Sequence, residues 1–333
     1  MTSRTYKFAI VGAGYMATRH IACIENSPNA EVAIVVNKGQ VVRNRLGASY
    51  ASSANHDALM AALRDDDRID GIVLCSPDHT HPDYLSQLLP SSKAILCEKP
   101  LARTEEEFRR ILQVIGDSKV MVGMNCRFRT KVQFLKTLIQ DGGCKEVRLI
   151  RATYYSNIAA IIAGTMKTWW SQYPKGVIPF LHGGAIHLFD ALRFLMGEVR
   201  EVSCTSIPSA TLRSLGGADF LVTMRFASQA VAGVAISGTS LGPNRFEIQI
   251  DADGCAVDGT NVYTRDPASD SPRCIALPAD DPHDLARQLT HVIDVIEGRA
   301  TPLNSVDEAY RNFHLIEACQ DSATSGNWVA VNR

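Results

Sequence analysis

The sequence predicts an α/β protein of two parts, an N-terminal parallel sheet with crossover helices and a C-terminal α+β domain with an antiparallel sheet. Two observations predict it. Short apolar runs alternate with helical patterns over about the first 125 residues, and after residue 200 strand-like runs follow one another without helices between them. The first arrangement is typical of parallel βαβ units, the second of antiparallel strands.

Length and composition agree with two ordinary globular domains. The chain has 333 residues, with 46% hydrophobic and 21% charged side chains. Its 34 Lys+Arg and 35 Asp+Glu give a net charge of -1, which provides no basic field for nucleic acid or an anionic membrane. No apolar run approaches the ~20 residues that span a bilayer, and no secretory segment begins the chain. The nine Cys are scattered without a C-x-x-C pair, which argues against a disulfide framework and fits a cytoplasmic protein.

In the first part, five apolar runs are the expected strands. They are continuously apolar rather than alternating, as expected for strands that are covered on both faces. A helix begins after Thr104, where Glu107 completes a capping box and Phe108 and Ile111 start an apolar stripe. The expected strands are residues 8–11, 32–36, 71–75, 94–97 and 120–122.

After residue 125 the pattern changes. Residues 146–155 alternate as a strand, an irregular stretch follows, and a helix is expected over 184–196. Two further helices are expected near the end of the chain, at 283–296 and from Ser305. The expected strands between them are residues 201–206, 219–226, 230–237 and 245–251. We therefore expect domains at 1–124 and 125–333, with C-terminal helices that can pack back on the first domain.

The first strand runs into a G-x-G-x-x-A turn, which predicts dinucleotide binding. Gly12 permits the tight turn, Gly14 lets a pyrophosphate approach the backbone, and Ala17 allows close packing of the helix on the strand. The helix that opens there offers unpaired N–H groups and the positive end of its dipole to phosphates.

The end of the second strand bears on the choice between NAD and NADP. An Asp or Glu is usual there when a ribose 2′-hydroxyl is bound, and this chain has Asn37 followed by Lys38, with Arg43 nearby. Lys38 or Arg43 could pair with a 2′-phosphate. Alternatively, Asn37 hydrogen-bonds the ribose and the basic residues are a solvated face. The sequence favours NADP and leaves NAD open.

Three further segments make a family resemblance recognisable. They are Cys-Ser-Pro-Asp-His-Thr-His at 75–81, Cys-Glu-Lys-Pro-Leu-Ala at 97–102 and Gly-Met-Asn-Cys-Arg-Phe at 123–128. In this order and spacing the chain resembles the Gfo/Idh/MocA family (glucose–fructose oxidoreductase, inositol dehydrogenase, rhizopine catabolism). The Glu-Lys-Pro tripeptide is the most specific piece.

The resemblance implies a doubly wound Rossmann domain followed by a domain with a large, open, mostly antiparallel sheet that serves oligomer contacts. It implies hydride transfer between NAD(P) and a secondary alcohol or ketone of a sugar, polyol or nucleotide sugar. Lys99 would lie beside the nicotinamide and the reacting carbon, and the segment 76–81 would line the nicotinamide. The expected cofactor-binding residues are Gly12, Ala13, Gly14, Tyr15, Met16, Asn37, Lys38, Arg43, Ser76, Pro77, His79, His81, Glu98, Lys99 and Asn125.

The chemistry of Lys99 agrees with that role. It follows a buried strand, so its ammonium stands at the carboxyl edge of the sheet, where ligands of open α/β sheets bind. Partial burial there would lower its pKa toward a range useful for proton exchange. Of the loop histidines beside it, we expect His81 to position its loop rather than to react.

In the second domain the resemblance implies an Asp and, four residues later, a His on one helix as acid/base and substrate ligands. His187 matches the His, but Gly183 stands where the Asp is expected. His182, one residue earlier, could substitute through a local shift of the chain. We expect His187 as acid/base, with a packed or capping histidine as the alternative, and Asp190 as a brace of the helix.

Substrate-selecting residues are expected in two places. Trp169, Trp170 and Tyr173 could stack on a sugar ring or simply pack together. Arg127 could hold a substrate carboxylate or phosphate, or form an interdomain ion pair. The histidines lack metal-ligand spacing, so no metal is expected.

The expected function is an NAD(P)-dependent oxidoreductase acting on CH–OH groups of a small molecule. The alternative is a sensor that keeps the dinucleotide fold without the chemistry, an idea that rests on Gly183. The resemblance also implies a homodimer or homotetramer formed through the second-domain sheet.

Overall fold

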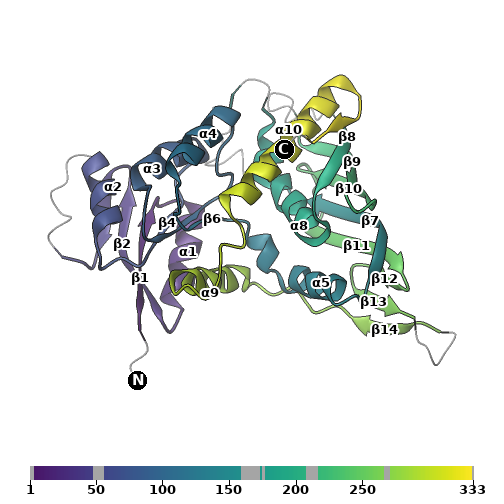
Figure 1. The fold of residues 1–333 in the computed structure, drawn as a ribbon, viewed down its shortest axis with the longest axis horizontal. Helices are drawn as coiled ribbons and strands as arrows, with labels where there is room; N and C mark the ends of the chain where they lie inside the picture. The colour runs from purple at the N-terminus through teal and green to yellow at the C-terminus, as the bar shows by residue number, and fades with distance from the viewer. Residues whose placement is uncertain are drawn as a thin grey trace. The chain divides into compact units, whose positions relative to one another are not determined.

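The computed structural model describes residues 4–47, 56–158, 173–174, 177–207, 217–265 and 271–331. The chain forms two compact units. Unit 1 comprises Met1–Asn125 and His283–Tyr310, and unit 2 comprises Cys126–Pro282 and Arg311–Arg333. The first change of unit falls after Asn125, and residues 283–310 return to unit 1, where helix α9 (Asp284–Ile296) packs on α1 (Tyr15–Glu25) (Figure 1).

Unit 1 is built on a six-stranded sheet in the order β3-β2-β1-β4-β5-β6. All neighbouring strands are parallel except β3, which pairs antiparallel with β2. Strands β4, β5 and β6 are buried throughout, and β1 and β2 are buried except at Lys7, Glu31 and Asn37, as their continuous apolar runs predict. The strands are β1 (Tyr6–Val11), β2 (Ala30–Asn37), β3 (Gln40–Asn44), β4 (Gly71–Leu74), β5 (Ala94–Cys97) and β6 (Val120–Val122).

Strand β3 is an element that the sequence analysis missed. It returns from β2 through a two-residue turn at Lys38 and Gly39, whose φ angles are 50° and 73°. Two successive positive φ angles make a tight hairpin turn, which fits the twist of the paired strands. The segment after β2 is therefore an edge hairpin, and Lys38 lies exposed at its tip.

Helices cover the unit 1 sheet. They are α1, α9, α2 (His56–Asp65), α3 (His81–Leu88) and α4 (Glu105–Val114). At the start of α4, Thr104 Oγ1 accepts from the Glu107 N–H at 3.2 Å, which is half of the expected capping box. The Glu107 carboxylate accepts from the N–H of Arg103 rather than of Thr104, at 2.7 Å.

Unit 2 is built on a nine-stranded sheet in the order β14-β13-β12-β11-β7-β10-β9-β8-β15. It is antiparallel apart from the β7–β10 pair, which is parallel. The strands are β7 (Lys145–Tyr155), β8 (Val199–Ile207), β9 (Asp219–Phe226), β10 (Val231–Ser237), β11 (Arg245–Asp253), β12 (Cys255–Val257), β13 (Asn261–Thr264), β14 (Arg273–Ala276) and β15 (Val329–Ala330). The fold class is thus the expected one.

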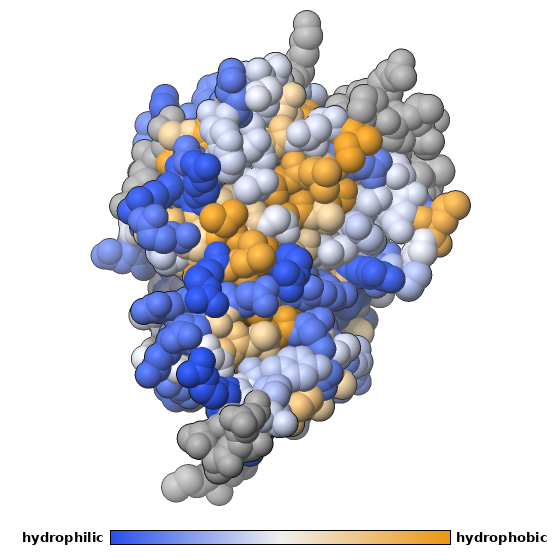
Figure 2. All heavy atoms as spheres, turned by 90° about the vertical axis from the view of Figure 1, so that its right-hand side faces the viewer, coloured by the Kyte–Doolittle hydropathy of each residue, from blue (hydrophilic) through white to orange (hydrophobic). Residues whose placement is uncertain are grey.

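The two faces of this sheet differ. One face lies under α5 (Thr130–Gln140), α8 (Ile186–Met196) and the later part of α10 (Val306–Ser325), as Figure 1 shows. The central strands alternate, with every second side chain buried toward these helices. On the other face the described side chains of Leu149, Ile207 and Leu221 are exposed, and Figure 2 shows apolar area in this view. Among the described residues, no helix is both long and apolar enough to cross a membrane.

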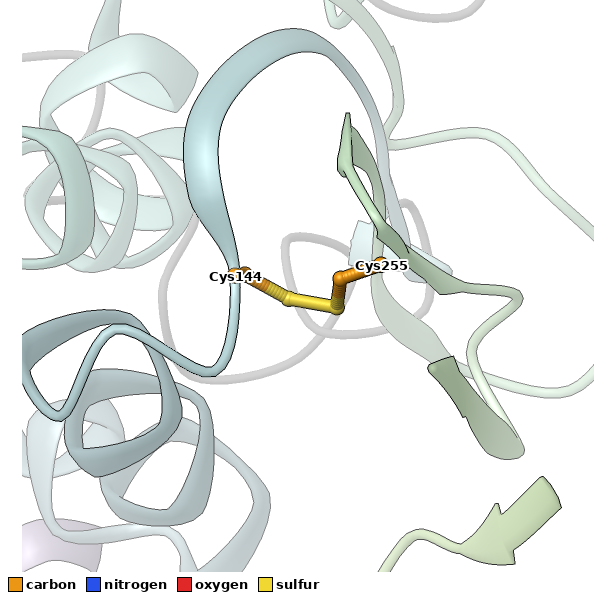
Figure 3. Close-up of a disulfide and its surroundings, with 2 residues drawn as sticks. All are labelled: Cys144 and Cys255. Atoms are coloured by element: carbon orange, nitrogen blue, oxygen red, sulfur yellow. A yellow bond between two sulfur atoms is a disulfide. The ribbon is translucent and has the colours of Figure 1, made fainter. Parts of the chain in front are cut away.

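Two cysteines correct the expectation that none is bonded. Cys144, just before β7, forms a disulfide with Cys255 at the start of β12 (Figure 3). Their Cα atoms are 5.2 Å apart, within the usual range for a disulfide. The two residues are 111 positions apart, and only the pairing of β7, β11 and β12 brings them together. Spacing along the chain could not reveal this.

Candidate active-site residues in two units

The surrounding backbone allows only a glycine at position 12. Its φ is +113°, and a Cβ there would lie 2.6 Å from the backbone of Cys75. The turn after β1 therefore lies directly against the turn after β4, and only glycine fits between them. This close approach is an additional reason for Gly12 beyond the tight turn that the motif predicts.

Gly14 is different, because no described residue requires a glycine at this position. Its φ is -82°, and a Cβ built on it would meet no atom of the described residues within 4 Å. It is the N-cap of α1, where no side chain caps the helix, and Ala13, Gly14 and Tyr15 are all exposed. Open space above uncapped helical N–H groups is what a pyrophosphate needs. The residues present therefore fit a dinucleotide.

The basic residues near the end of β2 divide into two groups. Asn37 ends β2 and the Lys38 side chain is exposed at the hairpin tip. Arg43 Nη1 instead donates to Glu25 Oε1 at 3.2 Å, and Arg45 donates to the same carboxylate at 3.1 Å. Glu25 is the last residue of α1, at the opposite end from the Gly-rich turn. Lys38, rather than Arg43, remains a candidate reader of a 2′-phosphate.

The segment from Ser76 to His81 forms a short 3-10 turn (Asp78–Thr80) that leads into α3. Pro77 is exposed, and Ser76 and His79 are partly exposed. His81 is 1% exposed, with Nδ1 2.8 Å from the Pro100 carbonyl oxygen and Nε2 2.9 Å from the Ser76 carbonyl oxygen. His81 therefore ties two loops together, as expected of a residue that positions its loop.

Lys99 follows β5 and is partly exposed, whereas Glu98 before it is buried. Glu98 Oε1 lies 2.8 Å from His20 Nε2, and its Oε2 accepts from the Lys99 N–H at 3.3 Å. Burial alone raises the pKa of Glu98, but the hydrogen bond from His20 and the charge of Lys99 outweigh it and hold the pKa below its usual value. Glu98 is thus a buried carboxylate beneath Lys99, not an exposed ligand for a cofactor.

Asn125 and two buried cysteines, Cys75 and Cys97, lie at or just after strand ends of the unit 1 sheet. Asn125 is partly exposed, and its Nδ2 donates to Asp284 Oδ2 at 2.5 Å. Burial raises the pKa of the Cys75 and Cys97 thiols well above their usual value. Both stay protonated and packed, so neither is a nucleophile.

In unit 2 the helix that carries His187 begins with an irregular turn. Leu181–Ala185 is a π-helix, and the Ile186 N–H donates to the Leu181 carbonyl, five residues back. A π-turn contains one residue more than an α-turn. The extra residue gives His182, rather than Gly183, the place about one turn before His187. The substitution of His182 for the expected Asp stays a prediction.

His182 is 1% exposed and lies among aromatic rings. The rings of Tyr173 and Phe313 are each 6.1 Å from its own, centroid to centroid. His187 is partly exposed on α8. Gly184 in the π-turn packs against Phe180, because a Cβ there would lie 2.3 Å from the ring. Trp169 and Trp170 lie outside the described residues.

Arg127 is not a substrate ligand in this structure, because its guanidinium is buried on Asp190. It is 2% exposed and donates from Nε and Nη2 to the two Asp190 oxygens at 2.8 and 2.7 Å. Asn312 Nδ2 donates to Asp190 Oδ1 at 2.7 Å, and Arg193 Nη1 donates to Asn312 Oδ1 at 2.8 Å. The expected ion pair is therefore present, but within unit 2, where it joins α8 to α10.

The sequence analysis missed His20 and Asn312. The sequence analysis did not single out His20, although its place on α1 brings it to the carboxylate of Glu98. The Glu98 that precedes Lys99 was the available signal, because a buried carboxylate needs a donor. Asn312 had no signal, since its partners Asp190 and Arg193 are more than 100 positions away along the chain.

Comparisons with known proteins agree with the two-part fold. Residues 6–126 match the family described as "Oxidoreductase family, NAD-binding Rossmann fold", and residues 132–254 match the "GFO/IDH/MocA C-terminal domain". Inositol 2-dehydrogenase of Rhizobium meliloti (strain 1021) is 29% identical over 218 residues, which cover 64% of this chain and 62% of that protein. The chain thus spans less than two thirds of the length of this curated relative.

Solved structures show the same fold over nearly the whole chain. A levoglucosan dehydrogenase in complex with NADH superposes with a TM-score of 0.79 at 20% identity, covering 99% of this chain and 100% of the other. Apo scyllo-inositol dehydrogenase from Lactobacillus casei gives a TM-score of 0.75 at 16% identity, covering 99% of each chain. With both domains matched in order, the chain belongs to the Gfo/Idh/MocA family of oxidoreductases.

Proposed function

We propose that the protein is an NAD(P)-dependent dehydrogenase that interconverts a secondary alcohol and a ketone on a sugar, polyol or related small molecule. The observation that carries the proposal is Gly14, a glycine that the fold itself does not need, above the exposed N-terminus of α1. Inositol and levoglucosan are acted on by proteins similar to this one, and both belong to the proposed substrate class.

The bound dinucleotide would supply the hydride acceptor or donor. The chain's own contribution begins with Lys99, whose ammonium stands at the carboxyl edge of the parallel sheet. We propose that its Nζ holds the proton exchanged with the alcohol oxygen and orients that oxygen. Ser76, His79 and Asn125 follow neighbouring strands at the same edge and would line the nicotinamide.

His187 is the proposed second acid/base, with His182 as the residue that takes the place of the family's Asp. The support is the π-turn, which sets His182 about one turn before His187. π-turns within helices occur frequently at functional sites. The alternative of a non-catalytic sensor rests on Gly183 alone. With His182 in the role of the Asp, Gly183 no longer argues against catalysis.

For the cofactor we propose NADP, read by Lys38. Asn37 carries no charge that would repel a 2′-phosphate, and Lys38 is exposed beside it at the hairpin tip. The similar levoglucosan dehydrogenase holds NADH. Preference for NADH would therefore assign Asn37 to the ribose hydroxyls.

We also propose that the open face of the unit 2 sheet joins two copies of the chain. Leu221 is 56% exposed, Ile207 45% and Leu149 41%, and Val231 and Ala235 lie beside them in register on β10. Exposed apolar side chains on one flat face favour a self-complementary contact. Sedimentation should show a dimer or tetramer, and Leu221→Arg should shift it toward monomer; a monomeric parent protein would contradict the proposal.

The proposed activity is tested by mixing the protein with NAD⁺ or NADP⁺ and a panel of inositols, sugars and anhydrosugars, and following nicotinamide absorbance. Reduction of the nicotinamide with at least one polyol or sugar is expected. Tight dinucleotide binding without hydride exchange on any member of the panel, in either direction, would favour the sensor instead.

A further inference from the structure

A buried hydrogen-bonded pair lies next to the backbone of Lys99. His20 on α1 is 4% exposed and Glu98 is 5% exposed, and their Nε2 and Oε1 atoms are 2.8 Å apart. A carboxylate only accepts, so the His20 N–H donates. Two buried polar groups that satisfy each other resist displacement, because separating them leaves both desolvated and unpaired.

This pair reaches Lys99 directly. The second carboxylate oxygen of Glu98 accepts the Lys99 N–H at 3.3 Å. On its other side the carboxylate lies against Gly123, where a Cβ would stand 3.1 Å from the carboxyl carbon and from both oxygens. Glu98 is thus enclosed between α1 and the turn after β6, and its orientation sets the peptide plane of Lys99.

A second buried histidine holds the next residue. The His81 ring nitrogens lie 2.8 Å from the Pro100 carbonyl oxygen and 2.9 Å from the Ser76 carbonyl oxygen, and the residue is 1% exposed; a neutral ring donates to one of these two oxygens and packs against the other. The Glu98-Lys99-Pro100 tripeptide is therefore fixed on the N-terminal side through His20 and on the C-terminal side through His81. Only the Lys99 side chain projects from this part of the chain into partly exposed space.

We propose that His20 and His81 are positioning residues: together with Glu98 they form a bracket that fixes the Lys99 backbone and thereby aims its ammonium. The proposal deepens the proposed function and rests on it for the kinetic effects. Displacement of a catalytic group by about 1 Å can cost about 100-fold in rate, so a loosened bracket should lower kcat without weakening cofactor binding.

The test compares His20→Leu, which removes the donor, with His20→Gln, which retains one. The first readout is hydrogen exchange at the Lys99 amide in the protein without added cofactor, with the Cys75 amide, which donates to the Val11 carbonyl, as internal control. His20→Leu should speed exchange at Lys99 by about tenfold or more and leave Cys75 unchanged, since only the Lys99 N–H loses its fixed acceptor. His20→Gln should restore most of the protection.

The second readout is kinetic. His20→Leu should lower kcat by about 10- to 100-fold while the Kd for the nicotinamide dinucleotide stays within about threefold. Leu63→Ala is the matched control: Leu63 is fully buried on α2 in the same unit, outside the bracket, and its truncation lowers stability without a specific effect on Lys99. It should change neither Lys99 exchange relative to Cys75 nor kcat.

Should His20→Leu fail to fold, Gly123→Ala disturbs the Glu98 carboxylate from the opposite side and should produce the same local exchange at Lys99. Unchanged Lys99 exchange in the folded variants, or an equal change in Leu63→Ala, would overturn the proposal. Absence of hydride transfer in the parent protein would overturn the proposed function instead, and the exchange experiment would still decide whether the bracket exists.

Discussion

The turn that carries Lys99 in unit 1 and the turn that carries His182 and His187 in unit 2 are stabilised in different ways. Lys99 lies at a strand end, and its supporting histidines lie on α1, which follows β1, and at the start of α3, which follows β4. The unit 2 histidines lie on a helix with an inserted residue, which is anchored by a buried ion pair three residues further on, at Asp190.

Because of this difference, substitutions in the two regions should have different effects. In unit 1 the parallel sheet brings the loops together whatever their sequence, and short polar contacts then orient one side chain. In unit 2 the position of α8 depends on Arg127, Asp190 and Asn312 together, because removing Arg127 or Asp190 leaves a buried charge and removing Asn312 takes away a donor to Asp190. We therefore expect substitutions in the first region to affect the chemistry and substitutions in the second to affect stability.

The largest expected effect is on the stability of unit 2. Asp190→Asn removes the charge that compensates buried Arg127 and should cost about 3–5 kcal/mol in the free energy of unfolding. Urea unfolding followed by circular dichroism measures it. Arg109→Ala, which breaks an exposed pair with Glu105 on α4, is the control and should cost no more than about 0.5 kcal/mol. Comparable losses of unfolding free energy in the two variants would contradict the expectation that the stability of unit 2 depends on the buried pair.

Lys99→Met tests the expectation that substitutions in the unit 1 region affect the chemistry rather than the stability. It should lower kcat by at least about 100-fold, the low end for loss of a proton-transferring group, and leave dinucleotide affinity and thermal stability nearly unchanged. Steady-state kinetics with the best substrate of the panel, together with a melting curve, measure both. Near-normal turnover would exclude Lys99 from the chemistry.

A smaller effect is expected at the β2–β3 hairpin. Lys38→Ala should weaken NADPH binding about 10- to 100-fold and leave NADH binding unchanged, because a charge-assisted hydrogen bond to phosphate contributes about 1.5–3 kcal/mol. Arg43→Ala is the matched control, since Glu25 already holds that guanidinium. Fluorescence titration of each variant gives the affinities, and a greater loss in Arg43→Ala than in Lys38→Ala would reverse the assignment.

The smallest expected effect is the alkaline stability of unit 2. Burial raises the pKa of Tyr154 on β7 from 10.0 to about 12. As pH rises above 10 the unfolded chain loses the phenolic proton first, so the folded state binds more protons and stability falls until about pH 12. Tyr154→Phe lacks this contribution, and its melting temperature should fall less steeply between about pH 9 and 11. Parallel pH profiles would contradict this account.

Several features could be predicted from sequence for physical reasons. Continuous apolar runs identify strands that are buried on both faces, and strand ends of a parallel sheet meet at one edge. Gly12, Gly14, the segment 76–81 and Lys99 each follow an expected strand of the parallel sheet, which predicts that they lie at the same edge, and the structure has them there. The hairpin strand β3 was missed because Lys38 and Gly39 give only a weak turn signal.

Other features could not be predicted because they depend on packing between distant segments. The π-turn at Leu181–Ala185 has no characteristic sequence pattern beyond its glycines. The Arg127–Asp190–Asn312 cluster requires the relative placement of three helical segments, and the Cys144–Cys255 disulfide requires the order of strands β7, β11 and β12. In each of these cases periodicity identifies the element but not its neighbours.

The measurement that tests the account most directly is titration of Gly14→Asp and Gly14→Asn with NADH and NADPH, beside the parent protein. Gly14 is the N-cap of α1 with room for a side chain, and Asp and Asn are both good N-caps, so both variants should fold with unchanged or higher thermal stability. We predict that Asn weakens dinucleotide binding by filling the cradle and that Asp, which also repels the pyrophosphate, abolishes it. Undiminished binding in a stably folded Gly14→Asp protein would contradict the proposed dinucleotide site, and with it the proposed dehydrogenase.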